Sequence, residues 1–71
     1  MASSVYRVID VIGTSDTSWE DATAAAVATA SGSLRDLRVA EVTKLDVTIG
    51  DDGKVQQYRA RIALSFKYES D

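Results

Sequence analysis

The last quarter of the chain alternates strictly between two kinds of side chain. Because successive side chains of a strand point to opposite faces, this alternation predicts a strand with one face packed against a helix. The other face mixes long cations with small residues, which is typical of a surface that another subunit or a ligand partly covers. The apolar set comprises Tyr58, Ala60, Ile62, Leu64, Phe66 and Tyr68, and the second set comprises Gln57, Arg59, Arg61, Ala63, Ser65 and Lys67.

Two further strands are predicted upstream. The β-branched residues from Val5 to Ile12 favour a strand that ends at Gly13. A second strand is expected from Leu37 to Ile49. The segment Gly50–Gly53 then predicts a hairpin turn that leads into the third strand, Lys54–Tyr68.

One helix is predicted between the first two strands. Residues 14–16 are expected to form a polar turn, and Thr17 with Glu20 matches a capping box. The alanine-rich segment Asp21–Ala30 favours a helix, and Gly32 is its predicted stop signal. The expected buried stripe comprises Trp19, Ala22, Thr23, Ala26 and Ala30.

This order of elements predicts an α+β fold in one domain, residues 1–71. The helix returns the chain to the start of the first strand, so the second strand runs parallel to the first. The third strand is antiparallel to both and can lie between them, which gives a β-α-β-β unit with a three-stranded antiparallel sheet of order 1-3-2. A chain of 71 residues buries only ~60% of its unfolded surface. Without cysteine or histidine, it is expected to gain stability by oligomerisation.

Composition and motifs argue against nucleic-acid binding, membrane association and catalysis as functions of this chain. The net charge of −3 predicts that nucleic acid is not the main partner, because phosphate binding needs a basic face. No segment resembles a signal peptide or a membrane span, so a cytoplasmic protein without membrane association is expected. The chain lacks a glycine-rich phosphate loop and a catalytic triad, so no enzyme activity is expected. Asp51-Asp-Gly53 fits the hairpin turn better than an EF-hand loop.

A series of motifs follows one order along nearly the whole chain: Val5–Ser15, Thr17–Ala22, Leu34–Leu37, Ala40–Val42, Gly53–Val55, Tyr58 and Phe66. This order of motifs resembles the dodecin family. That resemblance implies a β-α-β-β unit, assembly of twelve copies into a hollow shell, and non-catalytic binding and storage of flavins.

The ligand positions implied by the family differ in this chain. Val39 stands where flavin-binding members carry a tryptophan that stacks on the isoalloxazine ring, and Arg59 replaces a hydrogen-bonding glutamine. Asp46 and Lys67 each stand where many bacterial members have arginine. Trp19 does not replace the missing ring, because it lies in the first helical turn, where it is expected to anchor the helix to the core.

The changed positions resemble the calcium dodecin branch, through Ser18–Glu20, Arg38–Ala40, Asp46 and Ser65–Lys67. This branch implies the same shell with calcium in place of flavin. Calcium takes six to eight oxygen ligands, and the candidate carboxylates are Asp10 and Asp46. The alternative is that each carboxylate is solvated or paired with an arginine of the third strand.

The cations of the third strand are open to two interpretations. Arg59, Arg61 and Lys67 share one face and form either a site for a phosphate-bearing ligand or ion pairs between subunits, with Asp10, Glu41 or Asp46 as partners. Three functions therefore stay open: a calcium-binding shell, a shell that binds FMN or riboflavin in an altered pocket, and a structural shell with incidental ions.

Overall fold

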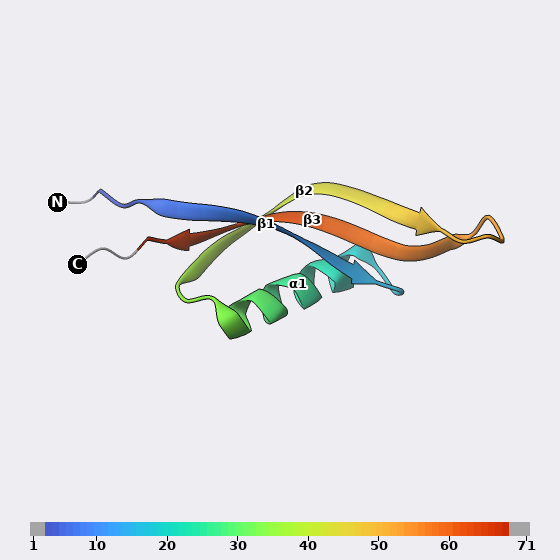
Figure 1. Ribbon diagram of the computed structural model, residues 1–71, viewed down its shortest axis with the longest axis horizontal. Helices are drawn as coiled ribbons and strands as arrows, with labels where there is room; N and C mark the ends of the chain where they lie inside the picture. The colour runs from blue at the N-terminus through green and yellow to red at the C-terminus, as the bar shows by residue number, and fades with distance from the viewer. Residues whose placement is uncertain (1–2, 69–71) are drawn as a thin grey trace.

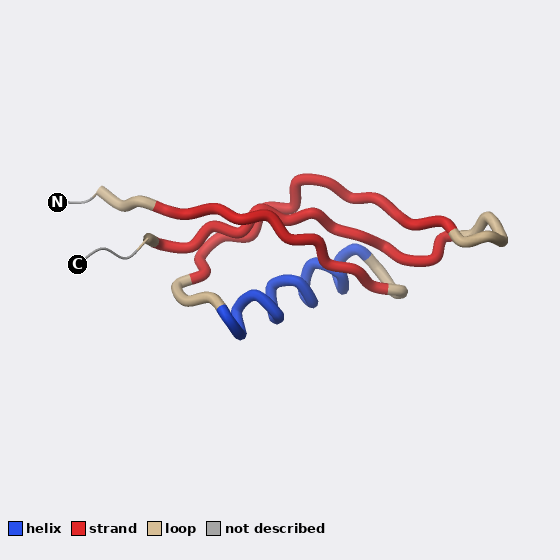
Figure 2. The backbone as a smooth tube through the Cα atoms, in the orientation of Figure 1, coloured by secondary structure: helices blue, strands red, loops and turns tan. Residues whose placement is uncertain are grey.

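The computed structural model describes residues 3–68 and contains one helix packed on a three-stranded sheet (Figure 1). The elements are β1 (Tyr6–Ser15), α1 (Trp19–Ser33), β2 (Leu37–Ile49) and β3 (Val55–Lys67). The sheet order is β1-β3-β2, and β3 is antiparallel to both neighbours. Figure 2 shows the helix on one side of the three strands. The predicted β-α-β-β topology is therefore confirmed.

The core forms where α1 crosses one face of the sheet. Its buried residues are Ala22 and Ala30 of α1 and Ala60, Ile62 and Leu64 of β3. The predicted alternation is confirmed for the centre of β3, because Ala60, Ile62 and Leu64 are buried in the core, whereas Tyr68 lies beyond the strand and is half exposed. The predicted helical stripe is confirmed for its alanines, whereas Trp19 remains 36% exposed.

The first strand is longer than predicted. We expected β1 to end at Gly13 and a turn to begin at Thr14, but the strand continues to Ser15. The glycine is needed for space rather than for a turn. A Cβ atom at Gly13 would lie 2.1 Å from the backbone oxygen of Ala22 and 2.9 Å from the Cβ of Ala26. Gly13 therefore allows α1 to lie directly on the strand.

Both predicted helix ends are displaced, the N-cap by one residue and the last helical residue from Ala30 to Ser33. Ser18, not Thr17, is the N-cap, because its backbone is extended and its hydroxyl accepts a hydrogen bond from the backbone N–H of Asp21 at 3.0 Å. Thr17 lies outside the helix and donates to Asp16 instead. At the other end, Gly32 lies inside the last turn and α1 ends at Ser33. Within residues 3–68, no helix is long and apolar enough to cross a bilayer.

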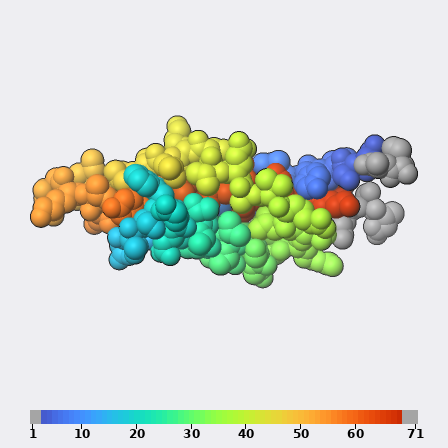
Figure 3. Space-filling view, turned by 180° about the vertical axis from the view of Figure 1, so that it is seen from behind, coloured from blue at the N-terminus to red at the C-terminus, as the bar shows by residue number. Residues whose placement is uncertain are grey.

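The folded chain is elongated and exposes an unusually large surface. Its extents are 57 × 20 × 15 Å and its radius of gyration is 14.9 Å, against about 11 Å for a compact chain of this length. Its accessible surface is 5234 Å², whereas a compact monomer of the same mass exposes roughly 4300 Å². The hairpin of β2 and β3 extends well past the start of α1 (Figure 3). A single copy therefore leaves apolar surface for other copies to cover.

Candidate functional site

The sheet face turned away from α1, here called the outer face, holds all of the predicted site residues. The strand register arranges its side chains in rows that cross β1, β3 and β2. Moving along β3, these rows are Thr14–Arg59–Asp46, Ile12–Arg61–Lys44, Asp10–Ala63–Glu41, Val8–Ser65–Val39 and Tyr6–Lys67. The predicted ligand positions Asp10, Val39, Asp46, Arg59 and Lys67 each belong to one of these rows.

Asp46 and Arg59 form the best-defined polar contact on the outer face. The Nε of Arg59 donates to Oδ1 of Asp46 at 2.8 Å, and its NH2 group donates to Oδ2 at 3.4 Å. The hydrogen bond from Arg59 lowers the pKa of the Asp46 carboxyl and raises the pKa of the Arg59 guanidinium. The two side chains remain 45% and 38% exposed, so a ligand can still approach the carboxylate.

Asp10 has a weaker partner of the same kind. The NH2 group of Arg61 lies 3.5 Å from Oδ2 of Asp10, and both side chains are 53% exposed. The interpretation of Asp10 and Asp46 as salt-bridged carboxylates is therefore confirmed. Both partners belong to the same chain, and pairing of these carboxylates with arginines of other subunits stays a prediction. Asp46 lies directly opposite Arg59, whereas Asp10 lies opposite Ala63 and reaches Arg61 diagonally in the next row.

The four family flavin positions do not converge within one chain. Val39 lies opposite Ser65 and is 53% exposed, while Lys67 follows one row further along. The Asp46–Arg59 pair lies six residues away along β3, which corresponds to about 20 Å at ~3.3 Å per residue. One chain therefore brings Asp46 and Arg59 together, and leaves Val39 and Lys67 at the other end of the outer face.

The two candidate calcium ligands are likewise separate. Asp10 and Asp46 lie on the two edge strands and four residues apart along the register, which places them roughly 15 Å from one another. In residues 3–68, no three acidic, histidine or cysteine side chains gather closely enough to hold a metal ion. The oxygens are of the type that calcium prefers, but one chain supplies only one of these carboxylates to any ion.

Trp19 has a role that the sequence did not indicate. Its indole N–H donates to the backbone oxygen of Asp46 at 3.0 Å. Its ring packs edge-on against the ring of Tyr58, and the two ring centroids lie 5.1 Å apart. Asp46 is thus held through its side chain by Arg59 and through its backbone by Trp19. The tryptophan anchors α1 to the edge strand β2 rather than to the buried core. Its position in the first helical turn was the only signal in the sequence.

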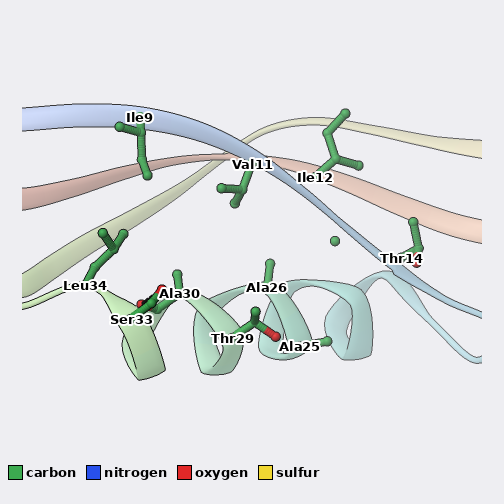
Figure 4. Close-up of a pocket in the computed structure, with 11 residues that line it drawn as sticks. Ile9, Val11, Ile12, Thr14, Ala25, Ala26, Thr29, Ala30, Ser33 and Leu34 are labelled. Atoms are coloured by element: carbon green, nitrogen blue, oxygen red, sulfur yellow. Dashed lines mark hydrogen bonds between the residues drawn. The ribbon is translucent and has the colours of Figure 1, made fainter.

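A groove of about 470 Å³ lies between α1 and β1, away from these residues. Figure 4 shows Ile9 and Val11 of β1 pointing toward Ala26 and Ala30 of α1, with Leu34 closing the end. The lining is mainly aliphatic and contains none of the predicted ligand positions. It belongs to the surface that a single copy leaves incompletely covered.

Comparisons with known proteins agree with this fold. A family model described as Dodecin matches residues 5–69. Calcium dodecin of Mycobacterium tuberculosis is 52% identical over 64 residues, which cover 90% of this chain and 89% of that protein. Dodecin of Thermus thermophilus is 37% identical over 65 residues, which cover 92% of this chain and 93% of that protein.

Solved structures give the same result. The structure of dodecin from Streptomyces coelicolor superimposes with a TM-score of 0.90 at 37% identity and covers 100% of both chains. The crystal structure of Mycobacterium tuberculosis calcium dodecin, described as having a novel calcium-binding site, gives a TM-score of 0.82 at 48% identity and covers 96% of both chains. By fold and by sequence, this chain belongs to the dodecin family.

Proposed function

We propose that this protein is a non-catalytic, homo-dodecameric shell that binds calcium between its subunits. Identity of 52% to a relative named calcium dodecin supports the choice of ion. The observation that carries the proposal is the Asp46–Arg59 pair, which places an accessible carboxylate where many bacterial dodecins have a cation. A partly exposed carboxylate is a ligand suited to a hard divalent cation.

The outer face lacks the features expected of a flavin pocket. Stacking on an aromatic ring is worth about 1 to 3 kcal/mol per base-like ring, and the row Val8–Ser65–Val39 contains no aromatic residue. Arg59, at the position of the hydrogen-bonding glutamine, is already engaged by Asp46. Both differences weaken the binding of an isoalloxazine ring and leave the carboxylate site in place.

Assembly is supported by the surface that one chain leaves open. The accessible surface of one chain exceeds that of a compact monomer by roughly 900 Å². This excess is close to the ~800 Å² that each partner buries in a standard protein–protein interface. The ion also requires assembly, because Asp10 and Asp46 are too far apart to share it in one chain. Copies related by symmetry, together with water and carbonyl oxygens, complete the six to eight ligands that calcium requires.

Calcium titration by calorimetry on the assembled protein tests the proposal. We expect Asp46→Asn to lose most of the calcium affinity, because calcium requires the charged carboxylate. Asp51→Asn, in the exposed hairpin turn, also removes one negative charge. This variant is expected to bind calcium with the same affinity as the unsubstituted protein. Asp10→Asn tests the second candidate ligand in the same way.

Three outcomes decide between the functions. Unchanged calcium uptake by Asp46→Asn removes this residue from the site, and an absence of uptake by the original protein rejects calcium binding. A yellow preparation that retains flavin absorbance after dialysis favours the flavin shell instead. Calcium bound between subunits must also raise the melting temperature of the assembly, so no rise at saturation contradicts an intersubunit site.

A further inference from the structure

Both oxygens of the Asp46 carboxylate are already occupied by a cation of the same chain. Asp46 and Arg59 are direct partners across β2 and β3, so the fold itself sets the guanidinium beside the carboxylate. The shorter contact, 2.8 Å, involves Nε and Oδ1, and the longer contact, 3.4 Å, involves NH2 and Oδ2. A metal ion at this carboxylate therefore has to share it with Arg59 or displace Arg59.

We propose that Arg59 is an intramolecular competitor of calcium for the Asp46 carboxylate and thereby sets the calcium affinity of the site. This inference rests on the proposed function. Calcium binds carboxylate oxygens at about 2.3 to 2.6 Å, so an ion at Oδ2 and the guanidinium at Oδ1 would be close neighbours of like charge. That repulsion, together with the lost hydrogen bonds, opposes calcium binding.

Release of Arg59 is feasible because the ion pair lies at the surface. The side chains of Asp46 and Arg59 are 45% and 38% exposed, so water can solvate the guanidinium once it leaves. Exposed ion pairs of this kind are weak, and competition by Arg59 therefore lowers the affinity without abolishing it. The backbone of Asp46 stays fixed during the exchange, since its carbonyl oxygen is held by Trp19.

The neighbouring pair provides a matched comparison. Arg61 lies two residues further along the same face of β3, but its contact with Asp10 is a single one of 3.5 Å. Substitution of either arginine by glutamine removes one positive charge and the same guanidinium from the same strand face. A specific effect of Arg59 therefore exceeds the effect of Arg61, whereas a general effect of net charge is equal for both. Lys54→Gln, in the hairpin turn, measures that general effect far from both carboxylates.

The test is calorimetric titration of calcium into the assembled original protein and the variants Arg59→Gln, Arg61→Gln and Lys54→Gln. We expect Arg59→Gln to bind calcium about three- to tenfold more tightly, given the modest strength of exposed ion pairs. Lys54→Gln is expected to change the affinity by less than about twofold, and Arg61→Gln is expected to change it less than Arg59→Gln does, because its contact with Asp10 is single and longer. Arg59→Lys keeps the charge but loses the two-pronged contact, so we expect an affinity between those of the original protein and Arg59→Gln. Size-exclusion chromatography with light scattering confirms that each variant assembles.

The outcomes separate this inference from the proposed function. If the original protein binds calcium and Arg59→Gln binds it equally or more weakly, the competition is rejected while calcium binding stands. A larger gain in Arg61→Gln than in Arg59→Gln also rejects it and points to Asp10 as the ligand. If only Arg59→Gln binds calcium, the competition is supported in its strongest form and the proposed function is rejected. Binding by none of the proteins rejects both.

Discussion

Replacement of Gly13 by alanine is the most direct test of how closely the helix lies on the sheet. The added Cβ would lie 2.1 Å from the backbone oxygen of Ala22, inside any distance that real Cβ atoms adopt. A shift to 3.0 Å requires a movement of about 0.9 Å between α1 and β1 in a close-packed region. The obstacle is backbone, so no side-chain rotation can relieve it.

The expected loss of stability follows from two opposing terms. Overpacking of a well-packed core costs about 1 to 3 kcal/mol, and the backbone contact places Gly13→Ala near the upper end of that range. Replacing glycine by alanine also lowers the conformational entropy of the unfolded chain, which raises the free energy of unfolding by about 0.4 to 1 kcal/mol. The net destabilisation is therefore about 2 kcal/mol, a large share of the 5 to 15 kcal/mol that holds a typical domain together.

Gly32→Ala is the matched control. Gly32 lies within α1, and nothing would lie within 4 Å of an added Cβ. Alanine in a helix is better than glycine by about 1 kcal/mol, so this variant is expected to be stabilised. We expect the two variants to differ by about 3 kcal/mol.

The assay is urea unfolding at one fixed protein concentration, because assembly makes stability depend on concentration. Light scattering verifies that the original protein and both variants have the same mass before unfolding. If Gly13→Ala and Gly32→Ala agree within about 0.5 kcal/mol, the close approach of α1 to β1 is refuted.

Two further predictions concern the helix start and the ion pair. Ser18→Ala is expected to lower the free energy of unfolding by about 1 kcal/mol because it removes the N-cap acceptor, while Thr17→Ala should change it by less than about 0.5 kcal/mol; urea unfolding that gives the reverse order contradicts this assignment. The pKa of the Asp46 carboxyl, followed by NMR, is expected to lie below its ordinary value and to rise toward it in Arg59→Gln. Because folding favours the charged carboxylate, the ion pair contributes fully above the unfolded pKa, and its contribution is lost as the pH falls through the lower folded pKa. An equal pKa in both proteins would show that Arg59 does not hold this carboxylate in solution.

The fold was predictable because its signals are periodic. The alternation along β3 fixed which side chains face the helix, and β2 was predicted with the bounds that the structure gives, Leu37–Ile49. The role of Gly13 was not predictable in the same way. Its requirement comes from a backbone oxygen of Ala22 in another element, and the sequence around a glycine does not distinguish such a close approach from a turn.

The ion pair depends on register, which the sequence leaves open. The pairing of β2 with β3 shifts by one residue between Thr48 and Ile49. Without that shift, Asp46 would lie opposite Tyr58 on the helix side, because a one-residue slip moves every side chain to the other face. The sequence therefore offered pairing of Asp46 with an arginine of the third strand as one alternative, but the residue pattern did not decide between Arg59 and Arg61.

The excess surface of a single copy has a consequence for how the protein forms. Within residues 3–68, a newly made chain buries five apolar residues and has one helix to cover its sheet. Its folding is therefore completed only when it assembles with other copies. The first copies made in a cell are the most vulnerable to proteases and to improper strand pairing at the two free edges. Strong dilution should accordingly yield unfolded polypeptide rather than a durable single subunit.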